Sequence, residues 1–347
     1  MKFSPLVSGV ASLAGVASAG TVLWDGRFND LTSSSDLDNW SWSNQVGPYQ
    51  YYIHGTGNVT EYVNLSSDYK NPADTASTQG AKISLTDTAY WNGQTMRRTE
   101  LIPQTTAAIN AGTVYYHFSI KRSDVNPPAE TREHQIMFFE SHFTELKAGW
   151  LSGASGTTDA NLRWMANSET QWNVTWEADV WHNVAYEIDF DGQTVAFWHS
   201  TGSDALTQVV APVSVSASSN GADFHVGVLE LPRDGYTDED EDIYVSGVYI
   251  ESGDLTTEIG GGEAASGSSS AVASTSAATS QASTSTVAAT STQASSSTVA
   301  ATSTVVATST AASSTTLATS TVAATTVASS SQAATSTLTT AASSASA

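Results

Sequence analysis

The C-terminal part of the chain has a composition that rules out a packed core there. From Ala264 to Ala347 there is no charged and no aromatic residue, and Ser, Thr and Ala dominate. Such a segment buries too little large apolar surface to offset the entropy lost on ordering. We therefore expect residues 259–347 to form a disordered tail, whose composition predicts O-glycosylation in a secreted protein. A single folded domain remains at residues 20–258, and it holds all ten tryptophans.

The first residues predict a secretory signal peptide over residues 1–19. Lys2 supplies a positive start, Leu6 to Val16 form a short apolar stretch, and Ala17 to Ala19 match a signal peptidase site. The stretch is too short to span a bilayer, and a buried N-terminal helix is the alternative. We expect a secreted, extracellular protein without a membrane anchor, which glycans could also retain in a cell wall. Four Asn-x-Ser/Thr sequons agree with secretion, at Asn39, Asn58, Asn64 and Asn173.

Charge and cysteine content narrow the class of partner. The formal net charge is −22, and no Lys or Arg follows Arg233. This acidity disfavours nucleic acid or an acidic polysaccharide as a partner, whereas a neutral polysaccharide is compatible with it. The chain has no cysteine, so disulfides cannot stabilise the domain and its core must do so. We expect a monomer without a cofactor.

The domain sequence predicts short strands separated by turns. Seven segments are rich in Val, Ile, Phe, Tyr and Trp, and Asp191-Gly192 between two of them is a hairpin signal. Many short strands with frequent breaks are typical of an all-β protein, and we expect a β-jelly-roll sandwich with an open concave groove. The predicted strands are Thr113–Lys121, Gln135–Phe143, Asn161–Met165, Trp181–Phe190, Thr194–His199, Ala222–Leu229 and Ile243–Ile250.

Two segments offer carboxylates for catalysis. If Met96 to Pro103 is a strand, Arg98 and Glu100 share one face, where the guanidinium would keep the carboxylate ionised and oriented. A surface ion pair without function is the alternative. Glycoside hydrolysis uses two carboxyl groups across the scissile bond, so a second carboxylate on a neighbouring strand would complete a catalytic site.

The second carboxylate, Glu140, lies in the hydrophobic segment His134 to Phe143. Strand alternation places Glu140 on one face with His134, Ile136, Phe138 and His142, whereas Met137, Phe139 and Phe143 make a core face on the other side. A Glu among aromatic residues is costly unless it is paired or functional, and burial would raise its pKa, as a general acid requires. A structural Glu satisfied by an Arg or His is the alternative. We predict Glu140 as the catalytic partner of Glu100, with both histidines in support.

Other polar and aromatic residues extend this predicted site. His225, inside a predicted strand, could orient a carboxylate or bind a sugar hydroxyl, and a hydrogen-bonded core histidine is equally compatible. Sugar rings stack on tryptophan faces, so we predict Trp91, Trp164 and Trp172 as substrate-binding residues, although core packing is the commoner role of a tryptophan. No zinc-ligand spacing occurs, and we interpret the acidic run from Asp238 to Asp242 as a solvated loop rather than a calcium site.

Five motifs within the domain are specific in combination. They are Val22 to Phe28, Gly47 to Tyr49, Arg97 to Leu101, Glu133 to His142 and Phe224 to Gly227. Together they resemble the catalytic domain of glycoside hydrolase family 131, a group of fungal β-glucanases, over residues 21–252. The resemblance implies a β-jelly roll with an open groove and activity on β-1,3-, β-1,6- and β-1,4-linked glucans. It matches the family's proposed catalytic carboxylates to Glu100 and Glu140 and its groove histidine to His225.

Two other functions remain open from the sequence. A polysaccharide lyase on a similar jelly roll would need cations such as Arg97 and Arg98 to neutralise a uronate, and the acidity of the chain disfavours it. A non-catalytic β-glucan-binding wall lectin would bind without cleaving, and it would not require two glutamates in the groove. The resemblance also implies that a cellulose-binding module, where a member carries one, comes after a Ser/Thr linker and depends on disulfides. The sequence has a linker-like tail but no cysteine, so we expect no tight anchoring to cellulose.

Overall fold

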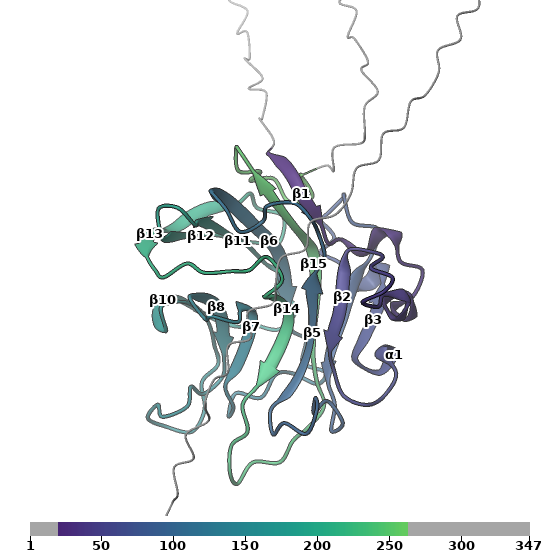
Figure 1. Ribbon diagram of the computed structural model, residues 1–347. Helices are drawn as coiled ribbons and strands as arrows, with labels where there is room; N and C mark the ends of the chain where they lie inside the picture. Colours follow the sequence, from purple (N-terminus) through teal and green to yellow (C-terminus); the bar gives the residue numbers. More distant parts are fainter. Residues whose placement is uncertain (1–19, 263–347) are drawn as a thin grey trace, which may run out of the picture. The chain divides into compact units, whose positions relative to one another are not determined.

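Two antiparallel β-sheets make up the part of the chain that the structure describes, residues 20–262 (Figure 1). This computed structural model confirms the predicted all-β sandwich. The first sheet contains β1 (Thr21–Asp25), β3 (Val63–Ser66), β4 (Gly80–Leu85), β6 (Thr113–Lys121), β11 (His182–Asp189), β12 (Thr194–Thr201), β13 (Thr207–Ser214) and β15 (Glu241–Ser252). The second sheet contains β2 (Tyr49–Ile53), β5 (Arg97–Pro103), β7 (His134–Phe139), β8 (Thr144–Ala148), β9 (Asn161–Ala166), β10 (Glu169–Thr175) and β14 (Phe224–Glu230).

The strand order brings distant parts of the sequence together. The first sheet runs β13-β12-β11-β6-β15-β4-β3, with β1 paired to β15, and the second runs β10-β9-β8-β7-β14-β5-β2. The helices in the described part are short, namely α1 (Val59–Tyr62), η1 (Phe28–Asp30), η2 (Ser34–Asn39) and η3 (Ser67–Tyr69). None of them is long and apolar enough to cross a membrane. The predicted signal peptide and almost all of the predicted tail lie outside the described residues.

All seven predicted strands overlap strands of the structure, and the Asp191-Gly192 hairpin joins β11 to β12 as predicted. Alternation along β5 also follows the prediction. Leu101 packs into the core between the sheets, and Thr99 reaches across to donate a hydrogen bond to the carbonyl of Ser84. Arg98 and Glu100, at the intervening positions, therefore lie on the outer face of the second sheet. We use "outer face" below for this surface, which is the side of the sheet where the sequence predicts a groove.

The predicted common face of His134 and Glu140 is wrong, because the strand alternation inverts between them. The backbone at Met137 has φ 49°, a left-handed conformation, and the register of β7 against β14 shifts beside it. As a result His134 and Ile136 point between the sheets, whereas Phe138 belongs to the outer face. An irregularity of one residue reverses every side chain beyond it.

His134 belongs instead to a buried network of charges between the sheets. Its Nε2 lies 2.6 Å from Glu241 on β15 and 3.5 Å from Glu230 on β14. Arg97 lies 2.6 Å from Glu230 and 3.3 Å from Glu241. Arg132 also contacts Glu230, at 2.7 Å. Ligand atoms of His134, Glu230 and Glu241 lie within 4.8 Å of one another. However, the two guanidinium groups already neutralise this set, so it is an ion-pair network rather than a metal site.

The same network corrects the prediction for the acidic run. Glu241 and Asp242 are buried members of β15, and Asp242 bonds Ser84 and, at 3.3 Å, Lys82. Asp238 pairs with Arg132. The run is therefore solvated only in part, because three of its five side chains form ion pairs and hydrogen bonds with the sandwich.

Replacing Arg97 by Met should destabilise the domain by about 3–5 kcal/mol, the cost of removing one partner from a buried charge network. Glu230 and Glu241 would lose the guanidinium that contacts both of them. Denaturant unfolding of the full chain measures the difference. The exposed substitution Asp124→Asn is the control, because its pair with Arg122 lies at the surface and should contribute less than about 1 kcal/mol. Equal stabilities of Arg97→Met and the wild type would contradict this account.

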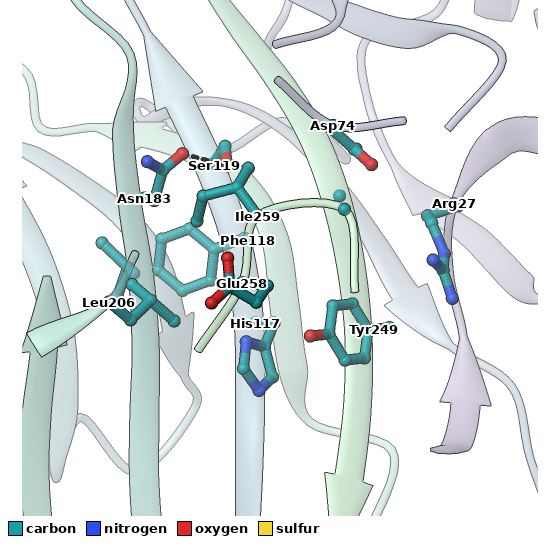
Figure 2. A pocket seen from close by; sticks show the side chains of 13 residues that line it. Arg27, Asp74, His117, Phe118, Ser119, Asn183, Leu206, Tyr249, Glu258 and Ile259 are labelled. Carbon is teal, nitrogen blue, oxygen red and sulfur yellow. Dashed lines mark hydrogen bonds between the residues drawn. The ribbon is translucent and has the colours of Figure 1, made fainter. Parts of the chain in front are cut away.

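The segment after β15 packs against the first sheet. The Thr257 carbonyl accepts a hydrogen bond from the Leu206 N–H, and Arg27 donates to the carbonyls of Gly261 and Gly262. The described domain thus continues four residues beyond the predicted boundary at 258. Figure 2 shows the pocket beneath this segment, lined on the first sheet by side chains such as His117 and Tyr249. Its cavity of about 20 Å³ has room for a single water and not for a sugar ring.

Candidate active site

Four charged side chains meet on the outer face of three neighbouring strands. Arg98 and Glu100 come from β5, His225 comes from the central strand β14, and Glu140 directly follows β7. The Glu140 N–H donates to the carbonyl of Asp223 at 3.0 Å, which extends the β7–β14 ladder and positions Glu140 beside His225. Residues from separate parts of the sequence converge here because β14 lies between β5 and β7.

The imidazole of His225 bridges the two predicted carboxylates. Its Nδ1 lies 2.6 Å from Glu100 Oε2, and its Nε2 lies 3.1 Å from Glu140 Oε2. On the far side, Arg98 holds Glu100 in a bidentate pair, with Nε 2.9 Å from Oε1 and Nη2 2.7 Å from Oε2. The order of groups is therefore guanidinium, carboxylate, imidazole and carboxylate. Such charge-assisted bonds fix the orientation of each group.

The two carboxylates differ in access. Glu100 is fully buried, at 0 % exposure, and both of its oxygens are bonded. The Glu140 side chain is 67 % exposed. Only Glu140 of this pair is open to a ligand on the outer face. Glu100 lies behind it and is linked to it by the contacts of His225 with both carboxylates.

The pKa of Glu140 corrects the prediction of a buried, proton-carrying acid. Glu140 stands just beyond the end of β7 rather than inside a buried strand. The hydrogen bond from His225 lowers the pKa of Glu140, and the charges of His225 and Arg98 act in the same direction against a smaller effect of burial. Glu140 is therefore ionised in the resting structure, as suits a general base or nucleophile.

His225 carries the compensating proton. Burial alone would lower the pKa of His225, but its hydrogen bonds with Glu100 and Glu140 outweigh burial and raise the pKa above the ordinary value. Both ring nitrogens of His225 lie within hydrogen-bond distance of a carboxylate oxygen, and only the imidazolium form can donate to both. This arrangement can pass a proton to or from Glu140 across a 3.1 Å contact.

A second histidine–glutamate pair lies on the other side of Phe138. The Phe138 ring stacks between His225, with centroids 4.4 Å apart, and His142, with centroids 5.3 Å apart. His142 Nδ1 lies 3.0 Å from Glu145 Oε2, and the His142 side chain is 39 % exposed. Sequence reasoning missed Glu145. Its signal was the short alternating segment after His142, in which Glu145 and Lys147 share one face of β8.

Three predicted site residues lie elsewhere. His134 is in the inter-sheet network described above. Trp164 is buried in the core, stacked on Phe197 of the first sheet, and Trp172 packs on Phe197 and His199. Both tryptophans therefore fill the space between the sheets. On β9 and β10, the side chains that lie on the outer face are those next to each tryptophan in the sequence, and not the tryptophans themselves.

Trp91 does border the site. It starts a turn that closes with a hydrogen bond from the Gln94 N–H to the Trp91 carbonyl at 3.0 Å, and Arg98 Nη1 lies 3.4 Å from Gln94 Oε1. The Trp91 ring also lies 6.3 Å from that of Tyr52 on β2, between centroids. Of the three predicted tryptophans, only Trp91 is placed beside the charged cluster.

Comparisons with known proteins decide the family. A family model described as the glycoside hydrolase 131 catalytic N-terminal domain matches residues 22–256. The chain belongs to glycoside hydrolase family 131. The search of curated proteins gives no match.

Two crystal structures of family 131 catalytic domains are similar to this chain over their full length. One is a β-glucanase catalytic domain from Podospora anserina, with 74 % sequence identity, a TM-score of 0.69, and coverage of 70 % of this chain and 100 % of that one. The other is from Coprinopsis cinerea, with 50 % identity, a TM-score of 0.66, and coverage of 71 % and 100 %. This chain is therefore a glycoside hydrolase with the catalytic domain of family 131.

Proposed function

We propose that this family 131 domain hydrolyses β-linked glucans, with β-1,3, β-1,6 and β-1,4 linkages as its substrates, and that Glu140 is the carboxylate that meets the scissile bond. The observation that carries the proposal is the exposed, ionised Glu140, bonded through His225 to the buried Glu100. The β-glucanase from Podospora anserina supports the substrate class. The net charge of −22 supports a neutral polymer over a charged one.

The mechanism follows from the order of the four groups. Because Glu140 is ionised and accessible, it accepts a proton from the attacking water as the glycosidic C–O bond breaks, and this proton passes on to the leaving-group oxygen. If Glu140 instead attacks the sugar itself, the leaving-group oxygen takes its proton from water, and the hydroxide that remains releases the sugar from Glu140. His225 holds a proton 3.1 Å from Glu140 and stabilises its charge. Glu100 and Arg98 keep the imidazole in place and in its protonated form. Glu100 is thus the second carboxylate of the site, and it is a positioning residue that acts through His225.

The wild-type enzyme should release reducing sugars from laminarin and from barley β-glucan. Hydrolysis consumes water and leaves saturated products, so no absorbance from an unsaturated sugar should appear. A polysaccharide lyase would show that absorbance with a uronate polymer. A wall lectin would bind the glucans without releasing reducing ends. Either of those results, without sugar release from any neutral glucan, would overturn the proposed function.

A further inference from the structure

Exposed aromatic side chains gather at the β2 edge of the second sheet. Of the large apolar residues that are exposed in the described part, three of five lie within residues 42–52: Trp42 at 68 %, Tyr52 at 40 % and Val46. The other two, Val125 and Val209, stand alone. Exposed apolar residues scattered singly need no explanation, but a contiguous patch on a soluble domain indicates a binding surface.

Four rings form a continuous row in this patch, which we call the aromatic track. Trp40 and Trp42 are 4.9 Å apart between centroids, Trp42 and Tyr52 are 6.3 Å apart, and Tyr52 and Trp91 are 6.3 Å apart. The first two contacts are edge-on, at 69° and 84°, so successive rings turn their faces in different directions. The core uses none of these four side chains in its hydrophobic cluster.

The aromatic track is continuous with the active site. Tyr52 lies on β2, which pairs with β5, the strand of Arg98 and Glu100 (Figure 1). Trp91 begins the turn whose Gln94 contacts Arg98. Strands in a sheet are about 4.8 Å apart, so β2 lies only roughly 14 Å across the sheet from β7, whose end carries Glu140. A polymer lying across these strands reaches both places at once.

The chemistry of the track suits uncharged sugar rings. A hollow of about 420 Å³ lies beside Tyr52 and Trp91, and its polar lining residues include His54, Thr56 and Asn92. No Asp, Glu, Lys or Arg lines it. Burial lowers the pKa of His54, so that side chain is neutral at neutral pH. Aromatic faces with a few neutral hydrogen-bonding groups match the apolar faces and hydroxyl rims of a pyranose.

We propose that the aromatic track of Trp40, Trp42, Tyr52 and Trp91 binds sugar units of a neutral β-glucan chain that lie beyond the bond being cleaved. This inference rests on the proposed function for the choice of polymer. Binding energy from such remote units serves to hold the scissile bond at Glu140. The track therefore favours long chains over short oligosaccharides.

The test measures binding separately from cleavage. The full chain with Glu140→Gln serves as the background, so that the polymer is not consumed, and affinity electrophoresis in laminarin and in barley β-glucan gives dissociation constants. The double substitution Trp42→Ala and Tyr52→Ala should weaken binding of both polymers by about tenfold, the scale for the loss of aromatic contacts. The weakening should shrink as oligosaccharides shorten to laminaribiose. Val125→Ala is the matched control, because Val125 is as exposed as Trp42 and lies outside the track.

The outcomes separate this inference from the proposed function. Unchanged polymer affinity in the double variant overturns the proposed binding role of the aromatic track, even if the wild type releases sugar. An equal loss of affinity in Val125→Ala overturns it too. Absence of any β-glucan binding by the Glu140→Gln chain also overturns it. The sequon at Asn39 adjoins Trp40, so a glycan attached there is the alternative occupant that the test has to separate. Tighter polymer binding after Asn39→Gln, with no effect of the double substitution, would assign the track to that glycan.

Discussion

Replacing Glu140 by Gln is expected to lower kcat for laminarin hydrolysis by at least about 100-fold, the scale of a lost acid/base group. Gln keeps the shape of the side chain and removes the charge and the basic oxygen. The domain should fold normally, because the Glu140 side chain is 67 % exposed and has no core contact. A large loss of turnover with unchanged stability is the signature of a group that acts on the substrate.

Reducing-sugar release and thermal unfolding of the same preparations measure the two quantities. Glu169→Gln is the control, since Glu169 is an exposed glutamate on β10 of the same sheet, far from β14 in the strand order. It should keep wild-type turnover. If Glu140→Gln keeps most of the wild-type kcat while the wild type cleaves laminarin, the chemistry lies elsewhere on the outer face. The pair of His142 and Glu145 would then be the next site to replace.

Local sequence signals predicted correctly those strands in which the strand-forming composition or the alternation of side chains continues without a break. β6 has the predicted bounds Thr113–Lys121, because nine consecutive residues fit a buried strand with no Gly or Pro among them. β5 places Arg98 and Glu100 on one face because its alternation is regular. The sequence also named all four members of the charged cluster, which are Arg98, Glu100, Glu140 and His225, although not that His225 bridges the two carboxylates.

The remaining features depend on contacts that the sequence does not display. Met137 adopts a left-handed backbone conformation although it is not a glycine. The sequence therefore contains no local signal that side-chain alternation inverts along β7 and that His134 points away from the outer face. Trp164 and Trp172 lie in alternating strands whose core face is decided by packing on Phe197. The edge strands β10 and β13 are mostly exposed, and β10 is polar whereas β13 contains Pro212, so neither has the composition of a half-buried strand.

Replacing Glu100 by Gln should lower kcat by about 100-fold, the order of effect when a reacting group is misplaced by ~1 Å. Glu100 is buried and cannot meet the substrate without leaving Arg98, so the loss must act through His225. The variant would keep the fold of the outer face and lose the charge that holds the imidazolium. A structural role alone would lower kcat equally at every pH, and the pH profile therefore distinguishes the two explanations.

The sign of the pH effect follows from the pKa of His225. Burial lowers this pKa, and the hydrogen bonds with Glu100 and Glu140 raise it more strongly, so the wild-type imidazole keeps its proton above its ordinary range. Activity that needs the imidazolium is complete below that pKa and is lost as pH rises through it. Without the charge of Glu100 the pKa of His225 falls. The alkaline limb of kcat should therefore move to lower pH in Glu100→Gln.

A second variant separates this effect from instability. Glu100→Gln leaves the buried Arg98 without its carboxylate, which costs stability in its own right. The double variant Arg98→Met with Glu100→Gln removes both charges together, so its stability should exceed that of the single variant while kcat stays low. Both variants should show the acid shift of the alkaline limb, because both lack the charge beside His225. An alkaline limb unchanged from the wild type in a folded double variant would show that Glu100 does not act on Glu140 through His225, and the two carboxylates would then have independent roles.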